Sequence, residues 1–171
     1  MAALALLFAY ALASPVAAPV PGVDVPLVNR RYGWQLEALG PGWRAIDLPS
    51  TLAAFTHDDG TVAVIVRVPG PSQRATETPK AAVVDKILRP RVRGYRREIY
   101  RARKFERPNR PTLFGLDLGY RAAGPAVGGL RMLLHPASSV AIQIERPVKP
   151  SRQARTAVDA LLARFGPVTL P

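Results

Sequence analysis

Apolar and polar residues alternate along several short stretches of this chain. The clearest stretch covers residues 62–68, where every second position is a valine and the positions between carry Ala63, Ile65 and Arg67. A period of two is the pattern of a β-strand, because successive side chains point to opposite faces of a sheet. Since both faces are largely apolar, we predict a central strand here.

Other stretches follow the same pattern less completely. The alternation of apolar residues predicts strands over 32–36, 43–48, 95–105, 113–121, 131–135 and 140–145. The turn Gly40-Pro41-Gly42 suggests that the first two form a hairpin, and residues 53–57 lead into a tight turn at Asp58-Asp59-Gly60. The glycine-containing segment 124–129 is predicted to be a flexible connection before a final hairpin.

Two segments have helical signals. Thr78-Pro79 supplies an N-cap and a first-turn proline, and Pro90 ends this short helix. A stronger helix begins at Pro150-Ser151 and ends at Gly166-Pro167. Its apolar residues recur every three or four positions: Ala154, Ala157, Val158, Leu161, Leu162 and Phe165.

The order of these elements predicts an α+β fold. Connections of hairpin size favour a largely antiparallel sheet of about six to seven strands, flanked by helices in a layered sandwich. The chain has 171 residues, which suits one domain, and we place that domain at residues 32–166. Trp34 and Trp43 are interpreted as core residues rather than a ligand platform.

The N-terminal residues form a separate region. Met1 to Ala13 are almost entirely apolar, too short a run to span a bilayer, and predict a signal peptide over 1–13. The missing basic residue at its start leaves open an upstream start site, or an apolar N-terminus in a cytoplasmic protein. Residues 14–31, rich in proline, are predicted to be a tether. We therefore expect an exported protein, periplasmic or extracellular, without a transmembrane segment.

The aromatic positions and the element order resemble a known family. The residues are Tyr32-Gly33-Trp34, Gly42-Trp43, Ala54-Phe55, the strand Ala63-Val64-Ile65-Val66, and the amphipathic C-terminal helix. Together they resemble the PsbP-like family, which includes small periplasmic proteins of the DcrB type, over residues 32–165. The resemblance implies an antiparallel sheet flanked by helices, used as an accessory or binding module rather than an enzyme. The lipid-attachment cysteine of many bacterial members is absent, since the chain has no cysteine.

The charge of the chain is concentrated in one segment. Of the formal net charge of +12, residues 89–110 supply eight, because ten basic residues face only Glu98 and Glu106. Arginines interleaved with aromatic residues are typical of surfaces that bind phosphate groups. On a strand, Arg97, Arg101 and Arg103 would share a face. The candidate anion-binding residues are Arg96, Arg97, Arg101, Arg103 and Lys104; the alternative is a solvated strand without a binding role.

Catalytic and metal-binding patterns are missing from the sequence. The absence of cysteine excludes thiolate nucleophiles and cysteine metal sites. His57 and His135 are placed at loop edges, and Ser138 and Ser139 lack the surroundings of a hydrolase nucleophile. We predict no catalytic, cofactor or metal site.

Two hypotheses on function follow. The first is a non-catalytic, exported accessory domain that binds a protein or a small ligand. The second is an electrostatic binder of anionic lipid or another polyanion through the arginine-rich strand. Nucleic acid is a poor partner for an exported protein.

Overall fold

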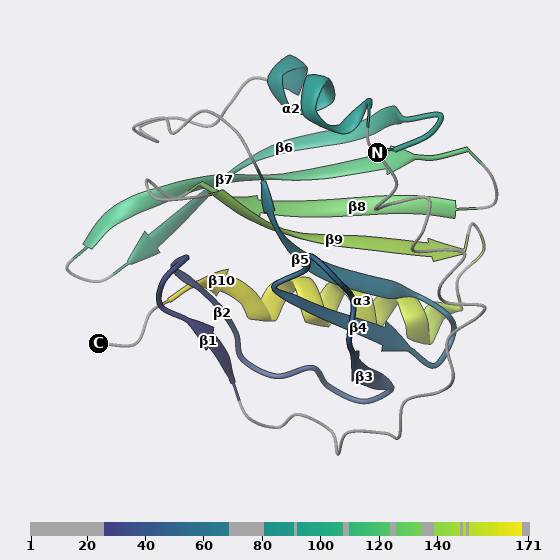
Figure 1. Ribbon diagram of the computed structural model, residues 1–171, viewed down its shortest axis with the longest axis horizontal. Helices are drawn as coiled ribbons and strands as arrows, with labels where there is room; N and C mark the ends of the chain where they lie inside the picture. Colours follow the sequence, from purple (N-terminus) through teal and green to yellow (C-terminus); the bar gives the residue numbers. More distant parts are fainter. Residues whose placement is uncertain are drawn as a thin grey trace.

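The computed structural model describes residues 26–68, 81–90, 92–107, 110–123, 126–134, 139–147, 149 and 151–168 (Figure 1). Along the chain the elements are β1 (Leu27–Asn29), β2 (Trp34–Leu36), β3 (Trp43–Ile46), β4 (Ala53–His57), β5 (Val62–Val68), α2 (Ala81–Leu88), β6 (Arg96–Arg107), β7 (Arg110–Arg121), β8 (Ala126–Leu133), β9 (Ser139–Pro147), α3 (Arg152–Arg164) and β10 (Phe165–Pro167). The predicted signal peptide, the predicted helix start at Thr78-Pro79, and residues His135, Ser138 and Pro150 lie outside the described residues.

Seven strands form the main sheet, in the order β3-β4-β5-β9-β8-β7-β6 with antiparallel neighbours. This confirms the predicted α+β class and the antiparallel sheet. The stretch predicted as a central strand is β5, which lies between β4 and β9, and its Ala63 and Ile65 are fully buried. The final hairpin is confirmed as β8 and β9.

The predicted connection at residues 124–129 is wrong from Ala126 onward, where β8 begins. Gly128 and Gly129 lie within β8 and pair with Tyr120 and Gly119 of β7. A Cβ atom on Gly128 would overlap the ring of Tyr120. These glycines therefore belong to a strand because a bare backbone leaves space for a neighbouring aromatic ring.

The predicted hairpin between residues 32–36 and 43–48 is also wrong. β2 belongs to a separate three-stranded sheet in the order β1-β2-β10, whereas β3 pairs with β4 at the edge of the main sheet. β1 lies in the range expected to be a tether. β2 is buried and takes β10 as a partner from the far end of the chain, so local turn signals could not reveal its pairing.

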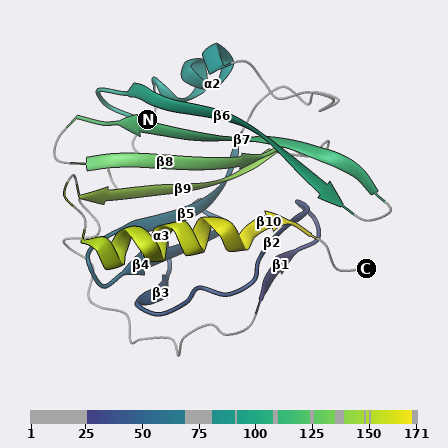
Figure 2. The same ribbon diagram turned by 180° about the vertical axis from the view of Figure 1, so that it is seen from behind.

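The two helices cover opposite faces of the main sheet (Figures 1 and 2). Val84 and Leu88 of α2 pack in one cluster with Leu116 and Met132. The other cluster, which includes Trp34, Phe55, Ile65, Ile142 and Phe165, contains Val158 and Leu161 of α3. The result is a layered arrangement of helix, sheet and helix.

The C-terminal helix starts where the sequence predicts, but it ends at Arg164, and Phe165, Gly166 and Pro167 form strand β10 instead of its last turn and stop. The Ser151 side chain accepts a hydrogen bond from the Ala154 backbone N–H at 3.0 Å, which satisfies one of the free donors at the helix start. Ala154, Val158 and Leu161 are its buried residues. Among the described residues, every helix is too short or too polar to traverse a bilayer.

Candidate binding site

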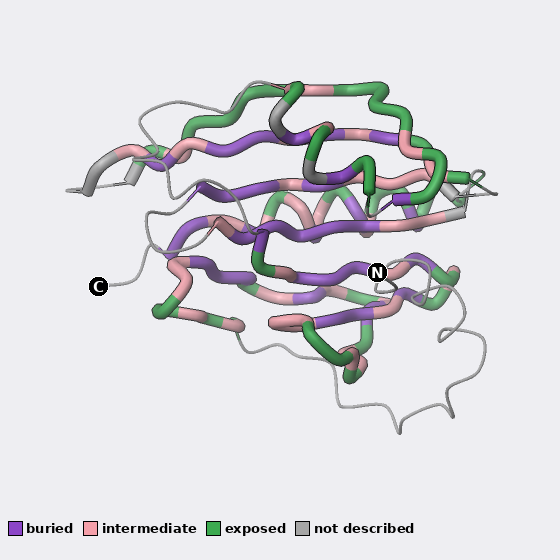
Figure 3. Tube along the Cα trace, turned by 45° about the horizontal axis from the view of Figure 1, so that its top comes forward, coloured by how far each residue is buried: buried purple, intermediate pink, exposed green. Residues whose placement is uncertain are grey.

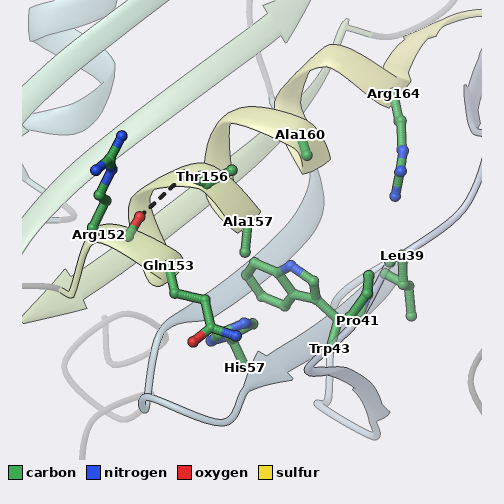
Figure 4. A pocket seen from close by; sticks show the side chains of 11 residues that line it. Leu39, Pro41, Trp43, His57, Arg152, Gln153, Thr156, Ala157, Ala160 and Arg164 are labelled. Carbon is green, nitrogen blue, oxygen red and sulfur yellow. Dashed lines mark hydrogen bonds between the residues drawn. The ribbon is translucent and has the colours of Figure 1, made fainter.

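A groove lies between α3 and the strands β3 and β4, at the β3 edge of the main sheet (Figure 4). We call it the α3 groove. Its volume is about 590 Å³. The residues that line it are Leu39, Gly40, Pro41, Trp43, His57, Arg152, Gln153, Thr156, Ala157, Ala160 and Arg164. They come from three distant parts of the sequence, which the fold brings together.

Trp43 is one of the apolar residues that line the groove. Its side chain is buried, and its indole ring meets the imidazole of His57 edge to face, with ring centroids 5.1 Å apart. Both tryptophans are therefore core residues, as the sequence predicted. The Trp43 indole N–H is buried and has no hydrogen-bond partner among the described residues. Figure 4 shows this nitrogen on the edge of the ring that faces α3.

The turn Gly40-Pro41-Gly42 leaves space at the groove, because its two glycines have no side chains. Gly40 and Gly42 have φ values of +84° and +79°, which glycine adopts without strain. A Cβ atom on Gly40 would lie 2.6 Å from Arg164 Nη1, and one on Gly42 would lie 2.6 Å from His57 Nε2. Each glycine thus makes room for one polar side chain of the groove.

His57 is held by the turn that follows β4. Its Nδ1 lies 2.9 Å from Asp59 Oδ1, while Thr61 donates from its backbone N–H to Asp59 Oδ1 and from its hydroxyl to Oδ2. Burial raises the pKa of Asp59, but the hydrogen bonds from Thr61 and His57 outweigh it and lower the pKa below its usual value. The carboxylate therefore stays ionised and fixes one imidazole nitrogen, while Nε2 faces Gly42.

The charges of the groove have one sign. Two arginines and His57 line it, and no carboxylate is among its lining residues in the described part of the chain. Figure 4 shows Arg164 extended beside Leu39 and Pro41, and Gln153 directed toward His57. The guanidinium of Arg152 is directed away from Trp43. Arg164 is therefore the cation that faces the apolar wall.

The predicted anion-binding residues all lie on β6, the opposite edge of the main sheet, and all are exposed (Figure 3). We call Arg96, Arg97, Arg101, Arg103 and Lys104 the arginine strand. Arg97 forms an ion pair with Asp85 of α2 and Arg103 with Asp117 of β7. Lys104 lies over the ring of Phe114, at 6.0 Å. In the described part of the chain, Arg96 and Arg101 make no ion pair.

The prediction that Arg97, Arg101 and Arg103 share a face is wrong. Arg101 pairs with Asp117 and Arg103 with Gly115, but Arg97 pairs with Tyr120, which lies on the other face of β7. The cause is an irregularity between Arg97 and Ile99, where the register shifts. One extra residue in a strand reverses the side to which the preceding side chains point.

A connection joins the arginine strand to α3. Asp117 accepts hydrogen bonds from Arg103 Nε at 2.7 Å and Arg131 Nε at 2.7 Å, and Arg131 also donates to the backbone oxygen of Leu162. Burial raises the pKa of Asp117, but the hydrogen bonds and charges of Arg131 and Arg103 lower it below its usual value. The chain β6-β7-β8-α3 is therefore linked by charge-assisted bonds.

A second buried polar cluster lies on the face covered by α2. Gln143 Nε2 donates to the Tyr120 hydroxyl at 2.6 Å and to Glu145 Oε1 at 3.1 Å, and Tyr120 donates to Glu145. Burial raises the pKa of Glu145, although these hydrogen bonds act in the opposite direction. None of the three residues lines the α3 groove. The cluster satisfies its own donors and acceptors, which is a structural role.

Metal binding has no support in the described residues. They contain no group of three or more histidine, aspartate or glutamate side chains that could hold an ion. Ser139, weighed as a nucleophile, opens strand β9.

The fold places the chain in a known class. No family model matches the sequence, and no curated protein matches it. The arrangement of a seven-stranded antiparallel sheet between helices is the α+β fold of PsbP-type proteins. A similar solved structure is that of cyanobacterial PsbP, CyanoP, from Synechocystis sp. PCC 6803, with a TM-score of 0.56 and 12% identity. The match covers 92% of this chain and 99% of CyanoP. At this identity the likeness establishes the fold alone.

Proposed function

We propose that this chain is an exported, non-catalytic accessory domain that binds a ligand in the α3 groove. The observation that carries the proposal is the groove itself, because a concave site of about 590 Å³ with an apolar wall and a few polar groups has the size of a small-molecule site. Trp43 and the alanines of α3 supply the apolar surface. His57, Gln153 and Arg164 supply the polar groups that would orient a ligand.

The chemistry of the groove supports binding rather than catalysis. An activated nucleophile needs a base within hydrogen-bond reach. The hydroxyl of Thr156 donates to the backbone oxygen of Arg152 at 3.1 Å, and the hydrogen bonds of His57 run to Asp59. Among the described lining residues, no nucleophile is therefore hydrogen-bonded to a base.

The groove is tested with N-phenyl-1-naphthylamine, an uncharged apolar dye that fluoresces in apolar surroundings. We expect the wild type to bind it and Ala157→Leu to lose it, because the larger side chain fills the groove. Ala163→Leu is the matched control, since Ala163 is an exposed residue of the same helix outside the groove. No binding by the wild type, or equal binding by Ala157→Leu, would overturn the proposal.

Export is tested separately by mass spectrometry of the native protein from fractionated cells. The apolar run at residues 1–13 supports this part of the proposal. A first residue near Ser14 in an extracytoplasmic fraction is the expected result. A cytoplasmic protein that retains Met1 would contradict it.

A second candidate function rests on the arginine strand. Arg96 and Arg101 are exposed and make no ion pair within the described residues, so their charges remain open to an anionic surface. We expect salt-sensitive binding to vesicles that contain phosphatidylglycerol, weakened when both residues become glutamine. The control pair Lys149→Gln and Arg155→Gln removes the same charge elsewhere. If both double variants lose the same vesicle binding, net charge alone explains the binding. If neither variant loses binding, this function is excluded.

A further inference from the structure

We infer that the α3 groove selects an amphiphilic anion, with a carboxylate or phosphate head group held by Arg164 and an apolar body against Trp43. This inference rests on the proposed function and names the ligand class of the same site. Carboxylates and phosphates are recognised in the same way here, because a guanidinium binds either oxyanion through two parallel hydrogen bonds.

The first argument is the position of Arg164. The residue closes the last turn of α3, and its backbone oxygen accepts a hydrogen bond from the Glu37 backbone N–H at 3.3 Å. Its guanidinium passes over Gly40, where a Cβ atom would lie 2.6 Å from Nη1. The bare backbone of Gly40 therefore leaves space for the guanidinium beside the groove.

The second argument is the charge around that guanidinium. No carboxylate lines the groove in the described part of the chain, and Arg164 forms no ion pair within it. The two carboxylates that follow His57 in sequence are engaged elsewhere, Asp58 with Arg44 and Asp59 with His57 and Thr61. An incoming anion therefore meets positive charge without a competing internal partner.

The third argument is the apolar wall beside this charge. The apolar residues that line the groove are Leu39, Pro41, Trp43, Ala157 and Ala160, and Figure 4 shows Leu39 and Pro41 beside Arg164 and Trp43 between them and His57. An inorganic anion would leave this surface exposed to water, whereas an alkyl or aromatic body would cover it. The indole N–H of Trp43, which has no partner among the described residues, adds a donor for an oxygen of the ligand.

The experiment compares two dyes that share one apolar scaffold. 8-Anilinonaphthalene-1-sulfonate carries a negative charge, and N-phenyl-1-naphthylamine does not. We expect the wild type to bind the anionic dye more tightly and Arg164→Gln to lose about tenfold in affinity for it, the usual effect of removing one charged partner. Affinity for the uncharged dye should stay unchanged in this variant.

Arg101→Gln is the matched control, because it removes the same charge from the opposite edge of the sheet. Its affinity for both dyes should equal that of the wild type. An equal loss in Arg101→Gln and Arg164→Gln would overturn the inference, since net charge alone would explain it.

Competition then identifies the source of the anion. Decanoate and decyl phosphate should displace the anionic dye and decanol should not, and the stronger competitor shows whether the head group is a carboxylate or a phosphate. If both dyes bind with equal affinity and only Ala157→Leu removes them, the anionic ligand class is wrong while the proposed function stands. If neither dye binds the wild type, both fail.

Discussion

The α3 groove and the arginine strand lie at opposite edges of the same sheet, and they hold their charges in different ways. Arg164 lies over the bare backbone of Gly40 and faces an apolar wall. The side chains of the arginine strand are exposed, and several are already paired with carboxylates. The number of basic residues is therefore a poor guide to a binding site. A single cation beside a concave apolar surface can be more selective than many on an open edge.

The largest expected effect on stability comes from a substitution in the packing of α3, which supports the α3 groove but not the arginine strand. Leu161 is a fully buried residue on the face of α3 that packs in the core, so Leu161→Ala should lower the free energy of unfolding by about 2–5 kcal/mol. Dye binding in the groove should weaken with it, while vesicle binding should persist wherever the protein remains folded. Urea unfolding measures the change, with Asp159→Ala on the exposed face as control. Equal stability of the two variants would contradict the assigned packing.

A smaller effect is expected from Asp117, which links the two regions. Its pKa is lower in the folded chain than in the unfolded chain, so its contribution is present above the usual aspartate range and is lost as the pH falls through the folded pKa. Asp117→Asn should cost about 1–3 kcal/mol at neutral pH, because Arg131 loses its charged partner.

The pH profile separates this role from simple packing. The stability gap between wild type and Asp117→Asn should narrow as the pH falls from about 5 toward 2, as chemical unfolding at each pH would reveal. A gap that stays constant over this range would mean that the Asp117 charge does not stabilise the fold.

The smallest expected effect concerns Gly40, and it tests most directly whether this glycine positions Arg164 in the groove. Gly40→Ala and Gly60→Ala each force a side chain into a positive φ, at a cost of about 1 kcal/mol, but only at Gly40 would the new Cβ meet another group, Arg164. We expect similar stabilities and a several-fold weaker affinity for the anionic dye in Gly40→Ala alone. An unchanged affinity would show that Gly40 does not position Arg164.

Elements with a local pattern could be predicted from the sequence. The alternating valines of β5 and the three-to-four spacing of α3 each carry their own signal, and both predictions are confirmed. The pairing of β2 with β10 and the reversed face of Arg97 depend on partners far along the chain or on one extra residue in a strand. Local alternation carries no information on either.

The groove was missed for a related reason. The sequence alone indicates a loop-edge residue at His57, a core residue at Trp43, and the connecting turn of a hairpin at Gly40-Pro41-Gly42. Each feature has an ordinary explanation alone. Only the packing of α3 against β3 and β4 shows that they surround one space. The two glycines on either side of Pro41 are the available signal, because glycine lets the backbone approach a neighbouring group closely.

The distribution of the two tryptophans has a further use. Trp34 lies in the small sheet and Trp43 in the large one, and both are buried. Replacing either by phenylalanine leaves a single tryptophan in a known layer, whose fluorescence can be excited apart from that of the tyrosines. Two such proteins would report whether the small sheet melts with the large one or detaches first. Cooperativity between the layers thus becomes directly observable without any added label.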